Sequence, residues 1–416
     1  MFARYRADLA RISPNARHFL LGSAFMGLAG AIPYTLLTLY LDRLGFNKEQ
    51  IGATEAAWSW GQVLIALPAA VLLGRLPTRL ILVVFGALAG CFGVLLPWAG
   101  GFAGIALVAF LGGLSWAVHY VVVAPFLFRN TGSEERGTVF GLVDAVHTTM
   151  AVIGSFAAGR LVSVLTERLA SETSALAWVI SISGLLPLVG VIFYGRIRED
   201  APNSADSTPL LPAIRKYRGT IARFSVPALI LGLGSGATVP FLALYFQDRF
   251  DFAPGDVGDL FAVAQAFMTT GFLISPLVLR HFGFVRSMVA FEVASIPFFL
   301  CLAFTNTLPL AIGAYLLRGA LMNSSGPIQR NFMMAAIPEE ARTAMNGLQA
   351  LLWGLGWVIG PWVGGRVLDA TGNDYTVLLS CTVVLYGLAS CSTWILLKPV
   401  ERRLSATASE AGTGTG

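Results

Sequence analysis

Residues 30–46 read GAIPYTLLTLYLDRLGF, and residues 236–252 read GATVPFLALYFQDRFDF. Each stretch is an apolar run with an internal proline, and each closes on an Asp-Arg pair. Asp42 of the first pair matches Asp248 of the second at an offset of 206 positions. A chain that repeats an apolar run and its charged end in this way predicts two related halves, each beginning with the same kind of helix.

The repeat continues beyond these two stretches. The same offset joins Glu134 with Glu340, Arg136 with Arg342, Gly141 with Gly347, and Gly159 with Gly365. Chance alignment of apolar sequence supplies isolated glycine matches, but it does not place charged residues at one fixed offset over such a distance. Parallel repeats of this kind occur in secondary transporters, where the substrate site lies near the midplane between the repeats.

The composition indicates a protein embedded in lipid. The chain has 416 residues, of which 56% are hydrophobic and only 12% are charged, whereas about 25% are charged in a typical soluble domain. The formal net charge is +5, but the basic residues lie in short connecting segments rather than in one patch, so no nucleic-acid partner is expected. Single cysteines inside apolar runs predict no disulfide, metal site or cofactor: Cys91, Cys301, Cys381 and Cys391.

Long apolar runs predict membrane-spanning helices, each of which needs roughly 20 mostly apolar residues. Alternating ten-residue segments typical of a membrane β-barrel are absent from the sequence. The expected spans are 17–41, 51–73, 80–98, 102–128, 137–161, 174–194, 222–246, 257–279, 287–305, 309–334, 343–369 and 376–397.

The distribution of lysine and arginine predicts the orientation of these spans. With a cytoplasmic N-terminus, the cytoplasmic segments hold 21 of the 28 basic residues, the opposite segments hold six, and Arg318 lies inside a helix. This asymmetry follows the positive-inside rule. We therefore expect both termini in the cytoplasm and a multi-pass protein of the cytoplasmic (inner) membrane.

The spans also predict a domain organisation. Residues 1–194 and 222–397 are expected to form two six-helix halves. Residues 195–221, which are rich in proline, serine and charge, are expected to form a flexible cytoplasmic linker. The low-complexity tail, 398–416, is expected to be disordered.

Twelve helices in a six-plus-six duplication with a basic central segment resemble the major facilitator superfamily of secondary transporters. The resemblance covers about residues 17–397. It implies an all-α integral membrane fold of two six-helix bundles, a monomeric chain in a lipid bilayer, and transport of a small molecule by alternating access. No GxxxxGK[ST], HExxH or GxSxG motif occurs in the chain, so neither use of ATP nor an enzymatic activity is expected.

The cytoplasmic loop motif of this family, Gly-x-Leu-Ala-Asp-Arg-x-Gly-Arg-Arg, is altered in both halves. AVLLGRLPTRL (70–80) has Gly74 at the position of the family's aspartate, and PLVLRHFGFVR (276–286) has Arg280 there. The remaining charges either clamp the cytoplasmic ends of the helices or act as ordinary positive-inside anchors. The candidate gating residues are Arg75, Arg79, Arg280, Arg286, Glu134, Arg136, Glu340 and Arg342.

A glycine motif associated with antiporters in this family is complete only in the second half. It reads GLGWVIGPWVGG (354–365), whereas the matching helix of the first half offers only GSFAAG (154–159). Gly356, Gly360 and Gly364 fall at i, i+4 and i+8, and this spacing predicts a smooth ridge that lets another helix approach closely.

Few ionisable residues lie within the expected spans, and these are candidates for proton coupling. Asp144 and His147 are three residues apart on one helix face and predict either a proton relay or a neutral hydrogen-bonded pair. Arg318 has either a substrate or coupling role, or a place in a buried ion pair. Glu55, near the outer end of its span, is the fourth candidate, whereas Glu292 is expected on a peripheral helix.

The family's geometry implies which helices face the substrate pathway. Aromatic and amide side chains on those helices suit a neutral or weakly cationic organic solute, or equally a sugar, but such aromatics also serve as packing. The cavity candidates are Tyr34, Trp58, Gln62, Trp116, His119, Tyr120, Gln265, Asn323, Gln329, Trp353 and Trp357.

The sequence thus predicts a secondary active transporter for a small organic solute, coupled to protons, with efflux favoured. The alternative function is proton-coupled uptake of a sugar or a related metabolite.

Overall fold

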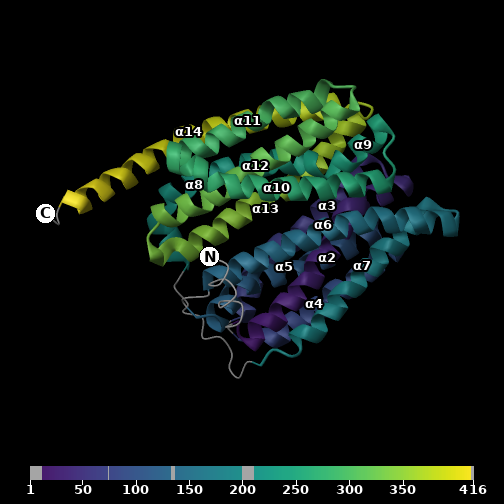
Figure 1. The fold of residues 1–416 in the computed structure, drawn as a ribbon, viewed down its shortest axis with the longest axis horizontal. Helices are drawn as coiled ribbons and strands as arrows, with labels where there is room; N and C mark the ends of the chain where they lie inside the picture. The colour runs from purple at the N-terminus through teal and green to yellow at the C-terminus, as the bar shows by residue number, and fades with distance from the viewer. Residues whose placement is uncertain (1–11, 74, 133–135, 199–209, 414–416) are drawn as a thin grey trace. The chain divides into compact units, whose positions relative to one another are not determined.

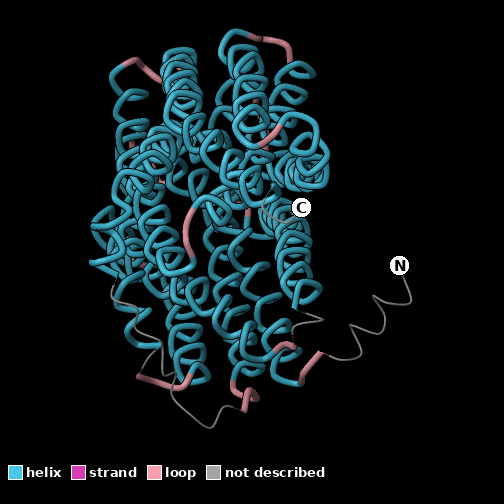
Figure 2. The backbone as a smooth tube through the Cα atoms, turned by 90° about the vertical axis from the view of Figure 1, so that its left-hand side faces the viewer, coloured by secondary structure: helices cyan, strands magenta, loops and turns pink. Residues whose placement is uncertain are grey.

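The computed structural model describes residues 12–73, 75–132, 136–198 and 210–413. Within these residues every regular element is a helix, and the connections between helices are short (Figure 1, Figure 2). The elements are α2 (Pro14–Arg43), α3 (Lys48–Leu73), α4 (Thr78–Leu95), η1 (Leu96–Trp98), α5 (Gly101–Asn130), α6 (Arg136–Leu169), α7 (Glu172–Tyr194), α8 (Leu210–Thr238), η2 (Val239–Phe241), α9 (Leu242–Phe250), α10 (Pro254–Phe282), α11 (Phe284–Phe304), α12 (Leu308–Ala336), α13 (Glu339–Ala370) and α14 (Tyr375–Thr413).

Every expected span corresponds to helix in the part of the chain that the structure describes. Nine segments of that part are long and apolar enough to cross a membrane, and α3, α12 and α13 are not among them. The last two helices contain the polar stretches NSSGPIQRN (323–331) and EEARTAMN (339–346). The number of spans and the cytoplasmic placement of the termini therefore stay predictions.

The repeated proline has a different effect in the two repeats. Pro33 lies inside the continuous helix α2. Pro240 lies in η2, a turn of 3₁₀ helix that separates α8 from α9. Because proline lacks a backbone N–H, each position removes one intrahelical hydrogen bond, and only at Pro240 does the helix change its winding.

The chain forms two compact units. The N-terminal unit comprises residues 1–205 and 240–265, and the C-terminal unit comprises residues 206–239 and 266–416. The N-terminal unit thus contains α2 to α7 together with α9 and the first part of α10. The expected division of the chain into two six-helix halves is a sequence prediction, and the compact units follow a different boundary.

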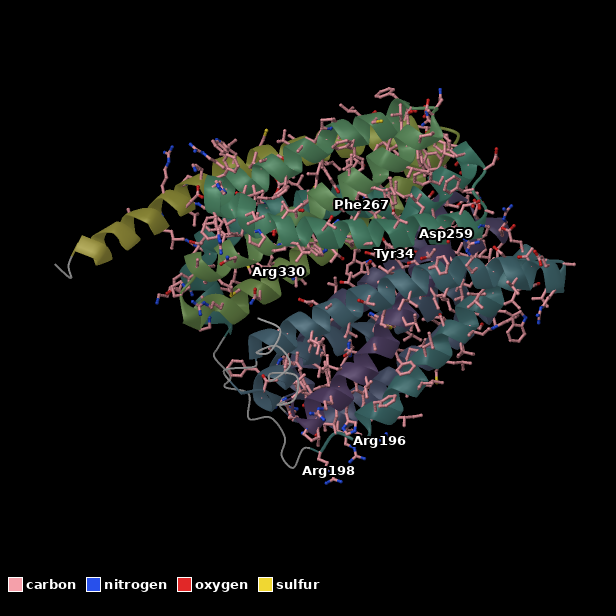
Figure 3. All side chains as sticks on the ribbon, viewed as in Figure 1. Tyr34, Arg196, Arg198, Asp259, Phe267 and Arg330 are labelled. Carbon is pink, nitrogen blue, oxygen red and sulfur yellow. The ribbon has the colours of Figure 1, made fainter. Side chains whose placement is uncertain are left out.

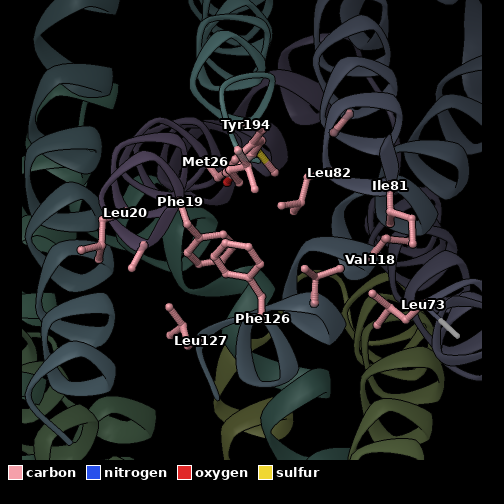
Figure 4. Close-up of a cluster of buried hydrophobic side chains, with 14 of the residues drawn as sticks. Phe19, Leu20, Met26, Leu73, Ile81, Leu82, Val118, Phe126, Leu127 and Tyr194 are labelled. Atoms are coloured by element: carbon pink, nitrogen blue, oxygen red, sulfur yellow. The ribbon is translucent and has the colours of Figure 1, made fainter. Parts of the chain in front are cut away.

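Aliphatic side chains and a few aromatic rings form a core cluster of the N-terminal unit (Figure 4). The ring of Phe19 stacks on that of Phe126 with centroids 4.8 Å apart, and it lies 5.9 Å from the ring of Tyr194. A Cβ atom at Gly22 would lie 2.2 Å from the Tyr194 ring. Glycine at this position therefore lets α7 bring its tyrosine against α2.

The two aspartates of the repeat meet in the N-terminal unit. Lys48 Nζ lies 2.8 Å from Asp42 Oδ1 and 3.1 Å from Asp248 Oδ2, and Gln247 Nε2 donates to Asp42 Oδ2 at 3.0 Å. Arg43, the partner of Asp42 in sequence, pairs instead with Glu172 at 2.9 Å. The charged ends of the repeated helices thus serve in ion pairs.

The glycine ridge of α13 packs directly on α8 in the C-terminal unit. A Cβ atom at Gly356 would lie 2.4 Å from the backbone of Gly232, and one at Gly360 would lie 2.7 Å from the backbone of Ala237. Such distances allow only glycine, so the close helix approach predicted from the sequence is confirmed. In the same unit, Phe332 packs against Phe224 and Phe284.

Two segments expected to lack structure contain helix. In the expected linker 195–221, α8 begins at Leu210, because Ile214 and Tyr217 share a face that packs on the core of the C-terminal unit. In the expected disordered tail 398–416, α14 continues to Thr413. Near the beginning of the tail, the Glu401 carboxylate accepts a hydrogen bond from the Val285 N–H at 3.1 Å and so connects α14 to α11. Residues 199–209 and 414–416 lie outside the described chain.

Candidate functional site

A cavity of about 370 Å³ lies among the helices of the N-terminal unit. Apolar residues and glycines line most of it. Its larger aromatic and polar side chains come from α2 to α7 and α10, and they are Tyr34, Glu55, Trp58, Gln62, Phe92, Trp116, Tyr120, His147, Ser183 and Gln265.

Two indole rings form one wall of this cavity. The rings of Trp58 on α3 and Trp116 on α5 have centroids 6.1 Å apart and planes inclined by 49°. A Cβ atom at Gly30 would lie 2.7 Å from the Trp116 ring, and one at Gly112 would lie 3.0 Å from the Trp58 ring. The two glycines thus provide the space in which the indoles are held.

His147 contributes an imidazole to the lining. Its Nε2 atom lies 3.4 Å from the Tyr120 hydroxyl, and its Nδ1 atom lies close to α2, where a Cβ at Gly27 would approach it to 3.1 Å. Asp144 lies on the same helix, is exposed, and does not line the cavity. The structure therefore brings only the imidazole of the predicted relay to the cavity wall.

Glu55 is the one carboxylate of the lining. Among the described residues, no hydrogen-bond donor or cationic side chain pairs with it, and the lining includes no lysine or arginine. A carboxylate removed from bulk water without a partner is costly to maintain. Such a residue in a membrane protein is a candidate for a functional role.

Three of the other predicted cavity residues line this cavity, namely Tyr34 (labelled in Figure 3), Gln62 and Gln265.

His119, which was also predicted to line the cavity, does not line it. Its Nδ1 atom lies 3.2 Å from the Tyr194 hydroxyl and its ring stacks on Phe19 at 5.7 Å, so it belongs to the buried core. Adjacent helical positions point to different faces, which is why Tyr120 reaches the cavity and His119 does not.

The predicted cavity residues of the C-terminal unit do not belong to this cavity. Asn323 Nδ2 donates to the carbonyl of Gly319 on its own helix at 2.8 Å. Trp353 and Trp357 have ring centroids 6.4 Å apart on α13, and Trp353 is 39% exposed. Gln329 is half-buried on α12.

Arg318 is packed inside the C-terminal unit. It is only 6% exposed, and its guanidinium carbon lies 4.9 Å from the ring centroid of Phe299 and 5.7 Å from that of Tyr315. The Tyr386 hydroxyl lies beside it and shares a 2.7 Å hydrogen bond with Ser235.

Glu292, on the helix expected to be peripheral, is also buried in this unit. It is 3% exposed, and the hydroxyls of Ser390 and Thr393 lie against its carboxyl group. The described part of the chain offers no ion-pair partner within 4 Å of either Glu292 or Arg318. The helix α11 thus buries its acidic residue against α14.

The candidate gating residues are dispersed. Arg75, Arg79, Arg280 and Arg286 are exposed, and Arg342 is half-buried. Glu134 and the side chains of Arg136 and Glu340 lie outside the part of the chain that is described. Arg129, which the motif comparison did not identify, donates from Nη2 to the Thr78 hydroxyl at 3.1 Å and so connects α5 to the start of α4.

Part of the lining could not be recognised from the sequence. Phe92 of α4 and Ser183 and Pro187 of α7 contribute to the cavity, although the family's geometry pointed to other helices. These side chains are apolar or small and occur throughout the apolar runs. Nothing in their spacing distinguishes a cavity wall from ordinary packing.

Comparison with known families agrees with the duplicated helical fold. A family profile described as Major Facilitator Superfamily matches residues 19–361 and 224–414. The chain belongs to the Major Facilitator Superfamily. It is therefore a multi-pass membrane protein of a transporter family, as the sequence resemblance implied. No curated protein matches its sequence.

Solved structures of this superfamily share the fold at low identity. The nucleoside transporter NupG is 16% identical with a TM-score of 0.75, over 92% of this chain and 99% of that one. A bacterial homologue of the human lysosomal transporter Spinster is 14% identical with a TM-score of 0.76, over 92% and 96% of the two chains. A D-xylose–proton symporter is 12% identical with a TM-score of 0.73, over 92% and 97%. These likenesses concern the fold alone.

Proposed function

We propose that this protein is a secondary active transporter that exports a small organic solute from the cell in exchange for protons. The observation that carries the proposal is the cavity of about 370 Å³ in the N-terminal unit. Its volume is within the range of about 300–1,000 Å³ typical of small-molecule sites. Its lining combines aromatic walls with few polar groups, which is the composition expected for an organic solute.

His147 and Asp144 are the proposed proton-coupling groups. The imidazole of His147 lines the cavity, and Asp144 lies one helical turn away on the same face of α6. A proton held by this pair in one conformation and released in the other would couple solute movement to the pH gradient. Membership of the superfamily supports alternating access as the means of exposing the pair to each side in turn.

The test begins with cells that lack or overproduce the protein, screened for altered susceptibility to organic compounds. A compound identified there is then followed in proteoliposomes under an imposed pH gradient. Asp144→Asn should abolish gradient-driven transport while leaving solute exchange, because the variant keeps the cavity but loses the acidic group of the proposed pair. Glu167→Gln, which changes an exposed carboxylate elsewhere on α6, should leave both processes unchanged.

Unaltered gradient-driven transport by Asp144→Asn would remove this residue from the coupling mechanism. Accumulation of the solute on the side with the lower proton concentration would instead identify an uptake symporter. The two outcomes are separable because the first is read from the variant and the second from the direction of flux in the unaltered protein.

A further inference from the structure

We propose that the cavity of the N-terminal unit is selective for small organic cations, with Glu55 as the counter-ion of the bound solute. The inference rests on the proposed transport function and specifies the charge of the solute. It follows from three features of the cavity: the unpartnered carboxylate, the aromatic walls, and the distribution of charge over the lining.

The first feature is the position of Glu55. The residue lines the cavity from α3, and the described residues provide it with neither a hydrogen-bond donor nor a cation. By contrast, the carboxylates of Asp42 and Asp248 in the same unit are both paired with Lys48. A carboxylate left without such a partner in a cavity is stabilised when a bound cation supplies the missing charge.

The second feature is the set of aromatic rings around the cavity. Trp58 lies one helical turn after Glu55 on α3, and its ring is 6.1 Å from that of Trp116. Tyr34 and Tyr120 also line the cavity, together with Phe92, and the two tyrosines are about half exposed, at 48% and 50%. The negative face of an aromatic ring attracts an organic cation.

The third feature is the scarcity of groups that would favour other solutes. The described lining contains no lysine or arginine, which an anionic solute would need as a counter-charge. A sugar would need several fixed donors and acceptors to replace its bonds to water. Gln62 and Gln265 are the two amide side chains of this lining, and the His147 imidazole is already within reach of the Tyr120 hydroxyl.

The test compares probes of one shape and different charge on the purified full-length protein. The probes are 1-methyl-4-phenylpyridinium, which is a permanent cation, neutral 4-phenylpyridine N-oxide, and anionic 4-phenylbenzoate. Equilibrium binding of radiolabelled 1-methyl-4-phenylpyridinium should be saturable, and it should be displaced far less by the other two probes. Glu55→Gln should weaken binding of the cation by about tenfold or more and leave binding of the N-oxide unchanged.

Matched control variants distinguish the loss of a cavity-lining side chain from a general effect of substitution in the same helix. Trp58→Leu should also weaken binding of the cation, whereas Trp60→Leu should not, because Trp60 is 42% exposed on the same helix and does not line the cavity. Glu167→Gln should bind the cation as the unaltered protein does. Each variant is accepted only if its thermal unfolding midpoint and its elution in size-exclusion chromatography match those of the unaltered protein.

Three results would overturn the inference: no saturable binding of the cation, equal binding of the neutral probe, or an unchanged affinity in Glu55→Gln. The last result would leave Glu55 with a role that does not involve the solute's charge. None of these results affects the proposed function, which fails if a pH gradient drives no solute transport or drives the solute in the same direction as the protons. A neutral solute exported against protons would keep the function and exclude the cation site.

Discussion

Glu55 and Arg318 are both ionisable side chains on helices of this membrane protein, and their surroundings differ. Glu55 lines a cavity and has no partner among the described residues. Arg318 is surrounded by the rings of Phe299 and Tyr315 inside a packed unit. A charge held by permanent neighbours has a structural role, whereas a charge that faces an open volume is available to a solute.

The surroundings of Arg318 lead to a stability prediction. Arg318→Ala should lower the thermal unfolding midpoint, because a desolvated cation–π contact contributes about 2 kcal/mol or more. Arg318→Lys should recover only part of this loss, since an ammonium group lacks the planar face of guanidinium. The midpoint is measured by intrinsic fluorescence of the purified protein during heating.

Arg330→Ala is the control for this prediction, because Arg330 is exposed on the same helix (labelled in Figure 3). The midpoint of that variant should be unchanged. If Arg318→Ala instead kept its midpoint and lost transport, Arg318 would be a substrate or coupling residue, which is the other role expected from the sequence.

At the scale of the helices, Lys48 connects three elements of the N-terminal unit. It lies at the start of α3, and its ammonium group is shared by Asp42 of α2 and Asp248 of α9. Its side chain is only 6% exposed, so the two carboxylates are neutralised away from most of the surrounding water. The segment α9, which follows the 3₁₀ turn at Pro240, is thereby attached to α2 and α3.

Lys48→Met should weaken this attachment, because it leaves two neighbouring carboxylates without their shared cation. A loss on the order of 2 kcal/mol is expected, between the values for exposed and buried ion pairs. Hydrogen–deuterium exchange should therefore increase in residues 242–250 and in the first turn of α3. The midpoint of thermal unfolding should fall as well.

The double variant Lys48→Met with Asp248→Asn provides the control for this prediction. It removes one of the two unbalanced carboxylates and should restore part of the protection against exchange. Protection in residues 242–250 that is the same in Lys48→Met and in the unaltered protein would show that packing alone holds α9 in place.

At the scale of the whole molecule, the orientation in the membrane is the main sequence prediction that can be tested directly. The positive-inside rule places Glu167, near the end of α6, on the outer side and Arg198, which follows α7, on the cytoplasmic side. Both residues are exposed. In a variant without Cys91, Cys301, Cys381 and Cys391, a membrane-impermeant thiol reagent should label Glu167→Cys in intact cells and leave Arg198→Cys unlabelled until the cells are opened.

Labelling of Arg198→Cys in intact cells, with Glu167→Cys protected, would reverse the predicted orientation. Labelling of both positions would require a different number of spans between them. The test is independent of the solute and of the coupling ion, so it remains informative whatever the outcome of the transport experiments.

Much of the fold could be predicted because periodic features specify it. Apolar runs of helical length, their short connections, and the repeat that joins Asp42 to Asp248 predict a duplicated helical membrane protein of a known superfamily. The ridge of Gly356, Gly360 and Gly364 likewise predicts a close helix contact. In each case the information is contained in the spacing of residues along one segment.

The expected linker and tail illustrate where such reasoning failed. Proline, serine and low complexity indicated loops, but the apolar spacing of Ile214 and Tyr217 favours helix in the linker, and the Glu401 contact to the Val285 N–H lies where α14 enters the tail. Local composition is a weak guide at the ends of a domain, because a few packing contacts decide whether the helix continues.

The sequence by itself determined the helical class, the duplication and the family, since these depend on period, offset and composition. Only the tertiary structure decided that Asp42 and Asp248 share Lys48, that His119 lies in the core while Tyr120 faces a cavity, and that Glu55 has no partner there. The physical reason is that the environment of a charge is set by side chains from several helices distant in sequence, and their convergence is not encoded in any one segment.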